Sequence, residues 1–503
     1  MPIQIYNTIL SWYFKKRYHQ IELFKKYPND VQQELWNGLV KTAANTEYGK
    51  QYDFKSLKNY NDFKNRVPLN KYEDISPTIE RIRRGEKNIF WPSSIKWFAK
   101  SSGTTNAKSK FIPVSNESLE DCHYKAGKDS FAIYVNNNPD TEVFSGKMLR
   151  LGGSHSIYEN NDTYFGDLSA ILIDNLPFWA EFGTTPSSKI SLMDGWEEKL
   201  TAIVNESINE NVRSLAGVPS WMLVLLNEII KKSNKNNLLE IWPNLELYLH
   251  GGVSFSPFKE LFRNLIPKSS FKYYETYNAS EGFFAIQDQN YSDELLLMLD
   301  YGIYYEFIPM EEYGNDNPTT INIDDVELYK NYAMVISTNS GLWRYVIGDT
   351  VKFTSISPYR IKISGRTKHY INTFGEELII ENADSALNFA CLKTGATITE
   401  YTAGPVYMKD KKSGSHEWIV EFEKEPADLN LFTHYLDESL KGLNSDYEAK
   451  RYNNMTLSPP ILHKARKRLF YDWLKKQGKL GGQNKIPRLA NNREYLDILL
   501  EIN

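Results

Sequence analysis

The chain reads Lys100-Ser101-Ser102-Gly103-Thr104-Thr105-Asn106-Ala107-Lys108, a hydroxyl- and glycine-rich loop between two short apolar segments. The flanking segments alternate apolar and polar residues, which predicts strands near 95–100 and 109–114. Gly103 permits a positive φ, so neighbouring backbone N–H groups can converge on one point. Four hydroxyls and two lysines around that point predict a polyphosphate site, although Ser/Thr/Gly runs also form ordinary turns. The loop lacks the Gly-Lys-Ser/Thr ending of a Walker loop, which excludes a P-loop NTPase.

The composition is that of a globular protein of several domains. The 503 residues are 41% hydrophobic and 14% aromatic, and 59 basic against 63 acidic residues give a formal charge of −4. This near balance predicts neither a nucleic-acid nor a membrane partner. Only Cys122 and Cys391 are present, which argues against a disulfide framework. The N-terminal apolar stretch, residues 9–14, precedes its basic residues, the wrong order for a signal peptide. We therefore expect a cytoplasmic protein of open oligomeric state.

The order of predicted elements indicates an α/β fold. Residues 18–45 have the spacing of an amphipathic helix, and short strands and helices then alternate up to about residue 295. The predicted helices are 196–208, 221–231 after the start signal Pro219-Ser220, and 258–265; the predicted strands are 245–249 and 272–276. Beyond residue 295 strands dominate: 302–309, 325–328, 333–338, 351–354 and 360–364.

Gly365-Arg366-Thr367 predicts a hinge, and with it a domain boundary. Beyond it we expect strands near 396–402 and 416–423, with helices near 376–389, 427–441 and 466–477. The chain is thus expected to form a large layered domain, residues 1–365, and a small α+β domain, residues 366–503.

A second motif runs from Tyr273 to Gly282, where Tyr277-Asn278-Ala279-Ser280-Glu281 ends a predicted buried strand. Ligands of α/β proteins bind at the carboxyl ends of strands. There the Tyr277 ring can stack on a purine and Glu281 can hold Mg²⁺ through a carboxylate oxygen. A strand that ends in a solvated glutamate is the alternative reading.

A third motif, Gly348-Asp349, ends the run from Gly341. A tight bend at Gly348 would present the Asp349 carboxylate for bidentate hydrogen bonding to a ribose diol. A plain turn between strands is the alternative.

The order of these motifs, followed by Gly365-Arg366, resembles the adenylate-forming superfamily, which includes acyl-CoA synthetases, luciferases and peptide-synthetase adenylation domains. Within it the chain most closely resembles the plant auxin-responsive acyl-acid amido synthetases, the Gretchen Hagen family, and their bacterial relatives. Ser101 to Thr105 with the trailing Lys-x-x-Pro at 110–113 is similar to that family's phosphate loop. Tyr277 to Glu281 is similar to its Tyr-Ala-Ser-Ser-Glu motif, except at positions 278 and 279.

The third motif departs from the family pattern at one position. Trp343 to Asp349 is similar to the family's Tyr-Arg-x-Gly-Asp motif, but Val346 stands where an arginine is expected, and Arg344 lies two positions away. The chain therefore lacks that arginine at the motif position.

The C-terminal run from Gly478 to Arg488 is glycine-rich and basic and is typical of an exposed loop. It also resembles the family's Gln-x-Lys-x-Pro-Arg segment, which implies that Lys485 is the mobile catalytic lysine, carried on a mobile C-terminal domain. By the same analogy residues 250–253 form the adenine-side wall, with a plain turn as the alternative. His155 and Trp179 would line the acyl pocket, although the residues themselves favour a core or loop role.

The resemblance implies an ATP- and Mg²⁺-dependent ligase that adenylates a small-molecule carboxylic acid and transfers the acyl group to an amine, an amino acid being expected. A carboxylate is already a nucleophile, so the first step needs positioning and charge neutralisation rather than a Ser-His pair. Ser101, Ser102, Gly103, Thr104 and Thr105 would hold the β- and γ-phosphates, and Tyr277, Ser280, Glu281, Asp349 and Arg366 would complete the ATP site. A thioester-forming acyl-CoA synthetase and a non-catalytic nucleotide-binding relative remain alternatives.

Overall fold

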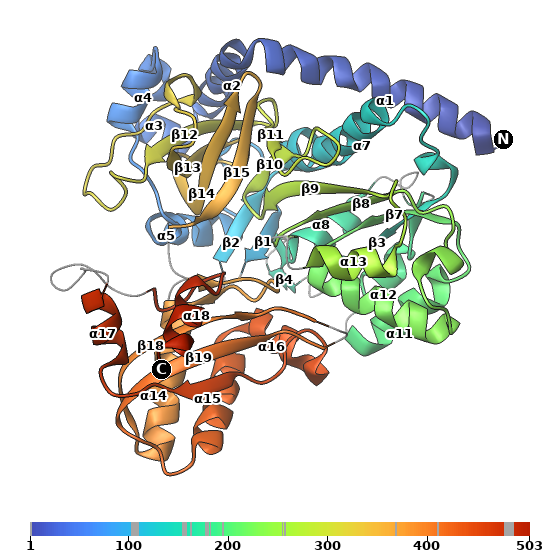
Figure 1. Cartoon of the computed structure of the whole chain (residues 1–503). Coiled ribbons are helices and arrows are strands. Elements are labelled where there is room, and N and C mark those ends of the chain that lie inside the picture. The colour runs from blue at the N-terminus through green and yellow to red at the C-terminus, as the bar shows by residue number, and fades with distance from the viewer. Residues whose placement is uncertain are drawn as a thin grey trace.

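The structure, a computed structural model, describes residues 3–101, 110–152, 158–160, 163–176, 181, 183–193, 196–253, 255, 258–367, 370–409, 412–476 and 487–503. It has a large part that runs to the end of β15 and a smaller part that contains the C-terminus (Figure 1). The mixed α/β class expected from the sequence is confirmed. None of the described helices is long and apolar enough to cross a membrane. The predicted cytoplasmic location stays a prediction.

An 11-stranded sheet organises the large part, with strand order β12-β13-β14-β15-β11-β10-β9-β8-β7-β3-β6. One end is parallel and consists of β3 (Lys147–Arg150), β6 (Thr184–Thr185), β7 (Val212–Ala216), β8 (Leu247–Gly251) and β9 (Lys272–Ala279). The rest is antiparallel and consists of β10 (Gly282–Ile286), β11 (Leu295–Leu297), β12 (Ile303–Pro309), β13 (Asn331–Thr338), β14 (Tyr345–Ile356) and β15 (Tyr359–Arg366). The two patterns meet at β9, so the carboxyl ends of β8 and β9 lie beside an antiparallel hairpin.

A second sheet carries the hydroxyl-rich loop. Its order is β2-β1-β5-β4, and the strands are β1 (Trp97–Ser101), β2 (Lys110–Val114), β4 (Tyr158–Asn160) and β5 (Thr163–Gly166). β1 and β2 are antiparallel, with Ser101 opposite Lys110. The two strands predicted on either side of the loop are therefore confirmed, and they bring the two ends of the loop together.

Helices surround both sheets, and long apolar runs lie inside. All residues of β12 and all but the first residue of β13 are buried, as expected for strands covered on both faces. The helices of this part are α1 (Ile3–Lys26), α2 (Pro28–Ala43), α3 (Glu47–Gln51), α4 (Tyr60–Arg66), α5 (Tyr72–Arg83), α6 (Asn116–Ser118), α7 (Lys125–Asn137), α8 (Leu168–Asp174), α10 (Ser188–Ser191), α11 (Trp196–Ser207), α12 (Pro219–Ser233) and α13 (Lys259–Leu265).

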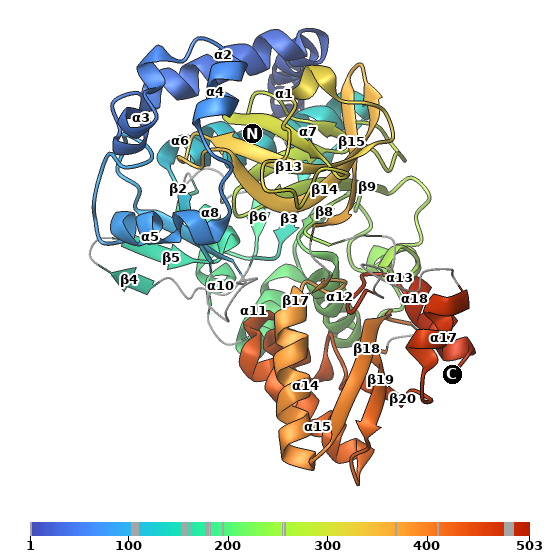
Figure 2. The ribbon, with the colours of Figure 1, turned by 90° about the vertical axis from the view of Figure 1, so that its left-hand side faces the viewer.

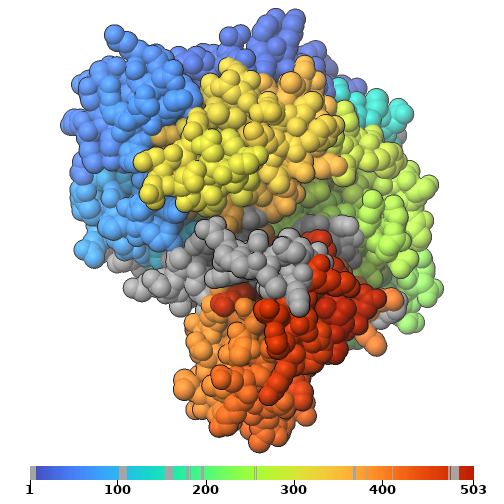
Figure 3. Space-filling model, turned by 60° about the vertical axis from the view of Figure 1, so that its left-hand side comes forward, coloured from blue at the N-terminus to red at the C-terminus, as the bar shows by residue number. Residues whose placement is uncertain are grey.

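The C-terminal part forms its own layer of helices and strands. In Figures 2 and 3 it is the orange-to-red lobe beneath the large part. Its elements are β16 (Tyr370–Ile371), β17 (Leu378–Ile379), α14 (Ile380–Thr394), β18 (Thr397–Val406), β19 (Ser415–Lys424), α15 (Leu429–Leu443), α16 (Ser445–Arg451), β20 (Ile461–Lys464), α17 (Leu469–Lys476) and α18 (Glu494–Glu501). The α+β character predicted for this segment is confirmed.

The two parts share apolar packing on the side of α12 and α13. Phe374, in the turn between β16 and β17, is fully buried, and its ring lies 6.3 Å from that of Phe258. Its carbonyl accepts a 3.0 Å hydrogen bond from the Ser220 hydroxyl at the start of α12. The Lys450 ammonium of α16 lies 4.0 Å from the centre of the Trp221 ring. The C-terminal part is therefore docked on the large part in this structure, while the predicted boundary at residue 365 and the mobility remain proposals.

Two predicted elements are wrong. The helix expected over 18–45 is two helices, because Pro28 cannot donate the backbone hydrogen bond that a continuous helix needs and instead occupies the first turn of α2. The strand expected over 325–328 is absent: residues 323–325 form a 3₁₀ turn, and only Leu328 makes an isolated bridge, to Phe353.

Candidate active site

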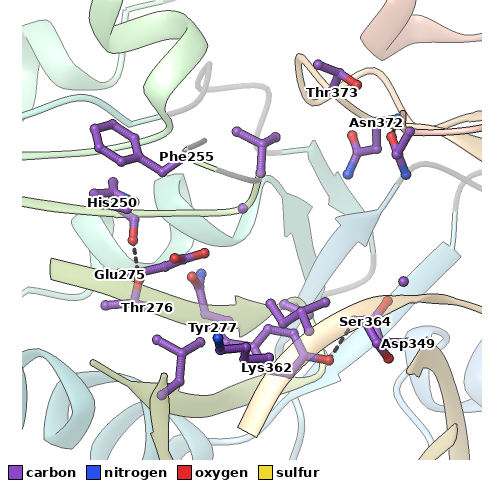
Figure 4. A pocket seen from close by; sticks show the side chains of 18 of the residues that line it. His250, Phe255, Glu275, Thr276, Tyr277, Asp349, Lys362, Ser364, Asn372 and Thr373 are labelled. Atoms are coloured by element: carbon purple, nitrogen blue, oxygen red, sulfur yellow. Dashed lines mark hydrogen bonds between the residues drawn. The ribbon is translucent and has the colours of Figure 1, made fainter. Parts of the chain in front are cut away.

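A cavity of about 1660 Å³ lies between the sheet of the large part and the C-terminal part. Residues at the carboxyl ends of β8 and β9 line it, together with residues of the β14–β15 region and of the β16–β17 turn. Figure 4 shows His250 and Phe255 on one side of this space and Asp349 and Ser364 on the other. The volume exceeds that of an ordinary small-molecule pocket and can accommodate a nucleotide with a second substrate.

Tyr277 and Asp349, predicted on separate motifs, meet in this cavity. The Tyr277 hydroxyl donates a 2.7 Å hydrogen bond to Asp349 Oδ2, and both residues are buried. The Tyr277 ring packs against Phe284 at a centroid distance of 4.9 Å. Gly348 has φ +94°, which confirms the tight bend predicted in front of Asp349. The hydroxyl therefore fixes the orientation of a carboxylate in the cavity wall.

Ser280 and Glu281 form the turn between β9 and β10, where Ala279 pairs with Gly282. Both line the cavity. The buried Tyr345 hydroxyl lies 3.4 Å from Glu281 Oε1 as a donor. Burial, and then the Glu281 charge, raise the pKa of Tyr345 well above its ordinary value, so this phenol stays protonated. The turn thus presents the Glu281 carboxylate to the cavity. Asp349, which belongs to the next motif along the chain, lines the same cavity.

Glu275 is a cavity residue that the motifs did not indicate. It precedes Tyr277 by two residues and therefore projects from the same face of β9. Its carboxylate makes no hydrogen bond to any residue in the described part of the chain, and burial, with the Asp293 charge, raises its pKa to about 7. Its register partner on β8 is His250. Strand alternation counted back from Tyr277 is the signal that would have found Glu275.

His250 is neutral at the wall of the cavity. Burial lowers its pKa to about 3, and its ring stacks on Phe255 at 4.0 Å. Its Nδ1 atom is buried and has no hydrogen-bond partner among the described residues. The adenine-side wall predicted at 250–253 therefore falls on the cavity, since His250, Gly252 and Val253 line it.

The C-terminal part contributes a lip to the cavity, which sequence reasoning missed. Asn372, Thr373 and Glu377 come from the β16–β17 turn, and Tyr407 and Asn491 come from further along the chain. Glu377 has φ +39°, and its N–H donates a 3.1 Å hydrogen bond to Asn372 Oδ1. These polar residues lie in loops with no motif of their own, so only the docking of the C-terminal part shows that they face the cavity.

Several predicted site residues lie outside the described residues: Ser102, Gly103, Thr104, Thr105, His155, Trp179 and Lys485. For Ser101 and Arg366 only the backbone is described. The described neighbours of Ser101 and Arg366 show where these two residues lie. Lys110, opposite Ser101 across the β1–β2 hairpin, lines the cavity. Asp349 and Arg366 are Cα partners in the β14–β15 pair.

The residues that follow Lys485 in the chain, from Pro487 to Asn492, lie beside the cavity. The Thr402 hydroxyl of β18 donates a 2.7 Å hydrogen bond to the carbonyl of Pro487, and Arg488 pairs with Asp384 at 3.0 Å. Asn491 and Asn492 line the cavity a few residues later. Lys485 thus precedes, by two residues in the sequence, a residue that is anchored to β18.

Arg344 does not replace the arginine that the motif lacks at Val346. Val346 lines the cavity, whereas Arg344 is buried in a separate ion pair, 2.9 Å from the fully buried Glu306. Its guanidinium also donates to the carbonyls of Lys64 and Val67. Arg344 has φ +44°, which turns it away from the strand direction. Among the described residues, Arg344 thus holds the N-terminal helices to the sheet.

Comparisons with known proteins cover nearly the whole chain. Residues 17–271 match the GH3 family N-terminal domain, residues 296–366 the GH3 family central domain and residues 381–494 the GH3 family C-terminal domain. The indole-3-acetic acid-amido synthetase GH3.3 of Arabidopsis thaliana is 21% identical, over 95% of this chain and 92% of its own. The 4-substituted benzoates-glutamate ligase GH3.12 of the same plant is 24% identical, over 93% and 94%.

Solved structures show the same fold. The GH3.15 acyl acid amido synthetase superposes with a TM-score of 0.60 at 17% identity, over 94% of this chain and 93% of its own. A 2-hydroxyisobutyryl-CoA ligase in complex with 2-HIB-AMP and CoA gives 0.55 at 14% identity, over 95% and 93%.

Proposed function

The chain belongs to the GH3 family, and from this premise we propose that it is an ATP-dependent ligase that adenylates a carboxylic acid and joins the acyl group to an amino acid. The matched relatives named above are an amido synthetase and an acid–glutamate ligase. One observation carries the proposal. One cavity, beside the hairpin of the hydroxyl-rich loop, is lined by Tyr277, Ser280 and Glu281 from the second motif and by Asp349 from the third.

The nucleoside binds at the Tyr277–Asp349 pair in this proposal. Asp349 accepts hydrogen bonds from the ribose diol, and Arg366, its Cα partner across the β14–β15 pair, would hold the ribose with it. The Tyr277 ring and the wall from His250 to Val253 enclose the base. The loop residues Ser101 to Thr105 bind the β- and γ-phosphates, because their hairpin places Lys110 on the cavity.

Glu281 is the residue that would hold Mg²⁺. Its carboxylate is a hard oxygen ligand on the cavity wall. The described residues contain no group of three or more His, Cys, Asp or Glu that could hold a metal. A single protein carboxylate fits Mg²⁺, which takes most of its ligands from phosphates and water. Bound there, the ion would supply positive charge against the phosphate oxygens.

The reaction has two balanced steps. A carboxylate oxygen attacks the α-phosphorus of ATP, the bond to the β-phosphate bridge breaks, and pyrophosphate leaves. The nitrogen of a neutral amine then attacks the acyl carbon, AMP leaves with the electron pair of the C–O bond of the mixed anhydride, and the amine loses one proton. The protein contributes positioning and charge neutralisation, for which Lys485 is the proposed mobile cation.

The C-terminal part supplies the proposed acceptor side. Thr373 and Glu377 of this part line the same cavity as the proposed nucleotide site. An amine that enters there is held by hydrogen-bond acceptors, which favour an ammonium or amine over an uncharged thiol.

Acceptor dependence tests the proposal. The enzyme is incubated with ATP and a panel of carboxylic acids, with each amino acid or with coenzyme A, and products are identified by mass spectrometry. We expect AMP together with an amide that contains an amino acid. Thioester formation with coenzyme A and no amide with any amino acid would make the chain an acyl-CoA synthetase. ATP binding without any turnover would identify a non-catalytic relative.

A further inference from the structure

The outer face of α1 exposes large apolar side chains. Ile9, Trp12, Tyr13 and Leu23 are 48%, 60%, 52% and 57% exposed. Ile9 lies three residues before Trp12 and four before Tyr13, and Leu23 lies eleven residues after Trp12, so all four side chains lie along one face of the helix. The opposite face covers the core, where Ile21 and Phe24 are almost fully buried. The helix is therefore apolar on two faces, of which only one is covered.

The same outer face carries positive charge. Residues 3–26 contain five Lys or Arg and one Glu, a net charge of +4, in a protein whose formal charge is −4. Arg17 is used inside, where it pairs with Asp129 at 2.6 Å. Lys15, Lys16 and Lys26 are exposed, and the Lys16 ammonium lies 4.6 Å from the Trp12 ring centre. Aromatic side chains and ammonium groups thus alternate on one exposed strip.

The catalytic proposal leaves this strip unexplained. None of the described residues that line the cavity lies in α1. The match to the family N-terminal domain begins at residue 17, so Ile9, Trp12, Tyr13 and Lys16 precede it. In Figure 1 the helix runs along the outer edge of the large part, with the N-terminus at its end.

We propose that α1 docks the protein on an anionic lipid surface. The helix lies in the plane of the interface, where amphipathic rings such as those of Trp12 and Tyr13 are favoured at headgroup depth. Ile9 and Leu23 insert beside them, while the exposed lysines extend their ammonium groups to lipid phosphates. A second copy of the chain fits the strip less well, because two α1 helices face to face would bring the exposed Lys15, Lys16 and Lys26 of one copy against those of the other.

Docking would add a location to the activity without altering its chemistry. The anionic surface attracts the strip although the whole protein is slightly negative, since the attraction acts within about a Debye length, ~10 Å. Vesicle binding requires neither ATP nor an acid. Its failure is therefore distinguishable from failure of the proposed ligase activity.

The test is co-sedimentation with vesicles. Full-length protein is mixed with phosphatidylcholine vesicles that contain none or roughly 30% phosphatidylserine. Two variants are compared with wild type: Trp12→Ala/Tyr13→Ala and Lys15→Glu/Lys16→Glu. A third, Tyr329→Ala/Leu392→Ala, removes equally exposed apolar side chains elsewhere and serves as the matched control. All four side chains of α1 are exposed, so thermal unfolding of each variant should match wild type.

We expect wild type and the control to bind the anionic vesicles, and each α1 variant to bind at least about tenfold more weakly. Neutral vesicles should bind all four proteins weakly, and raised salt should release the wild type. Equal binding by wild type and both α1 variants would overturn the proposal, as would absence of binding to anionic vesicles. Sedimentation velocity that shows a dimer lost in Trp12→Ala/Tyr13→Ala, without vesicle binding, would assign the strip to a second copy instead.

Discussion

The Tyr277 hydroxyl and the Asp349 carboxylate, 72 residues apart in the chain, form a buried 2.7 Å hydrogen bond in the wall of the interdomain cavity. This bond fixes a carboxylate oxygen at the place where a ribose is proposed to bind.

Tyr277→Phe should weaken ATP binding while leaving the fold intact. Loss of a hydrogen bond to a charged group costs about 1.5–3 kcal/mol, roughly a ten- to hundredfold rise in the Kd for ATP. Isothermal titration with ATP measures it. The exposed Tyr329→Phe is the control and should bind ATP as wild type does. An unchanged Kd in Tyr277→Phe would separate this pair from the nucleotide.

Glu275→Gln should change the pH dependence of stability. The pKa of Glu275 is raised to about 7, so the folded state favours the protonated carboxyl. The resulting stabilisation is complete below the unfolded pKa of about 4.3 and is lost as the pH rises through about 7. Glutamine is neutral throughout, so the variant should match wild type near pH 4.5 and exceed it by about 1–3 kcal/mol at pH 8.

Denaturant unfolding at both pH values measures this difference. Glu294→Gln changes another glutamate that is absent from the cavity lining and should show no such gain at pH 8. A constant difference between Glu275→Gln and wild type from pH 4.5 to pH 8 would contradict the raised pKa.

Arg344→Met should destabilise the fold without touching the nucleotide site. Arg344 and Glu306 are buried, and removal of one partner leaves an uncompensated charge that costs about 3–5 kcal/mol. The melting temperature should fall, while the Kd for ATP of the folded variant stays that of wild type. Arg344→Met/Glu306→Leu should regain much of the loss. Weaker ATP binding at wild-type stability would show that Arg344 reaches the nucleotide.

Lys485→Ala should slow adenylation far more than it weakens ATP binding. If a mobile ammonium neutralises charge at the α-phosphate, its loss should lower the rate about a hundredfold or more. ATP affinity should change less than about threefold, since the group acts in the transition state. Pre-steady-state formation of the adenylate and equilibrium ATP binding measure the two effects. Lys479→Ala, six positions earlier in the sequence, is the control, and equal loss of rate and affinity in Lys485→Ala would remove the mobile-lysine role.

Local elements could be predicted where a residue with a strong conformational preference, or a clear alternation of apolar residues, marks them. The start of α12 at Pro219, the strands β1 and β2 and the bend at Gly348 follow from proline, alternation and glycine. The single helix over 18–45 failed because its apolar spacing continues across Pro28, so periodicity outweighed the missing N–H. The prediction of a strand at 325–328 was wrong because a short alternating run does not tell whether a sheet edge is available for it to pair with.

The site could be predicted only where a motif marks it. Tyr277, Glu281 and Asp349 were identified from order along the chain, and the structure brings them to one cavity. Glu275 has no motif, and its place depends on the face of β9 that Tyr277 shares. Asn372, Thr373 and Glu377 face the cavity because of packing between Phe374 and Phe258, which depends on contacts more than 100 residues apart that no local pattern encodes. The exposed strip of α1 likewise needed the structure, since sequence alone does not tell which apolar face is covered.

Acid-dependent exchange of labelled pyrophosphate into ATP tests the central claim most directly. The assay contains enzyme, ATP, Mg²⁺, labelled pyrophosphate and one carboxylic acid at a time, with no amine, so only the reversible first step runs. We predict exchange with at least one acid, none without acid, and a large loss of exchange in Asp349→Ala. Tight ATP binding with no exchange for any acid in a broad panel would contradict the account.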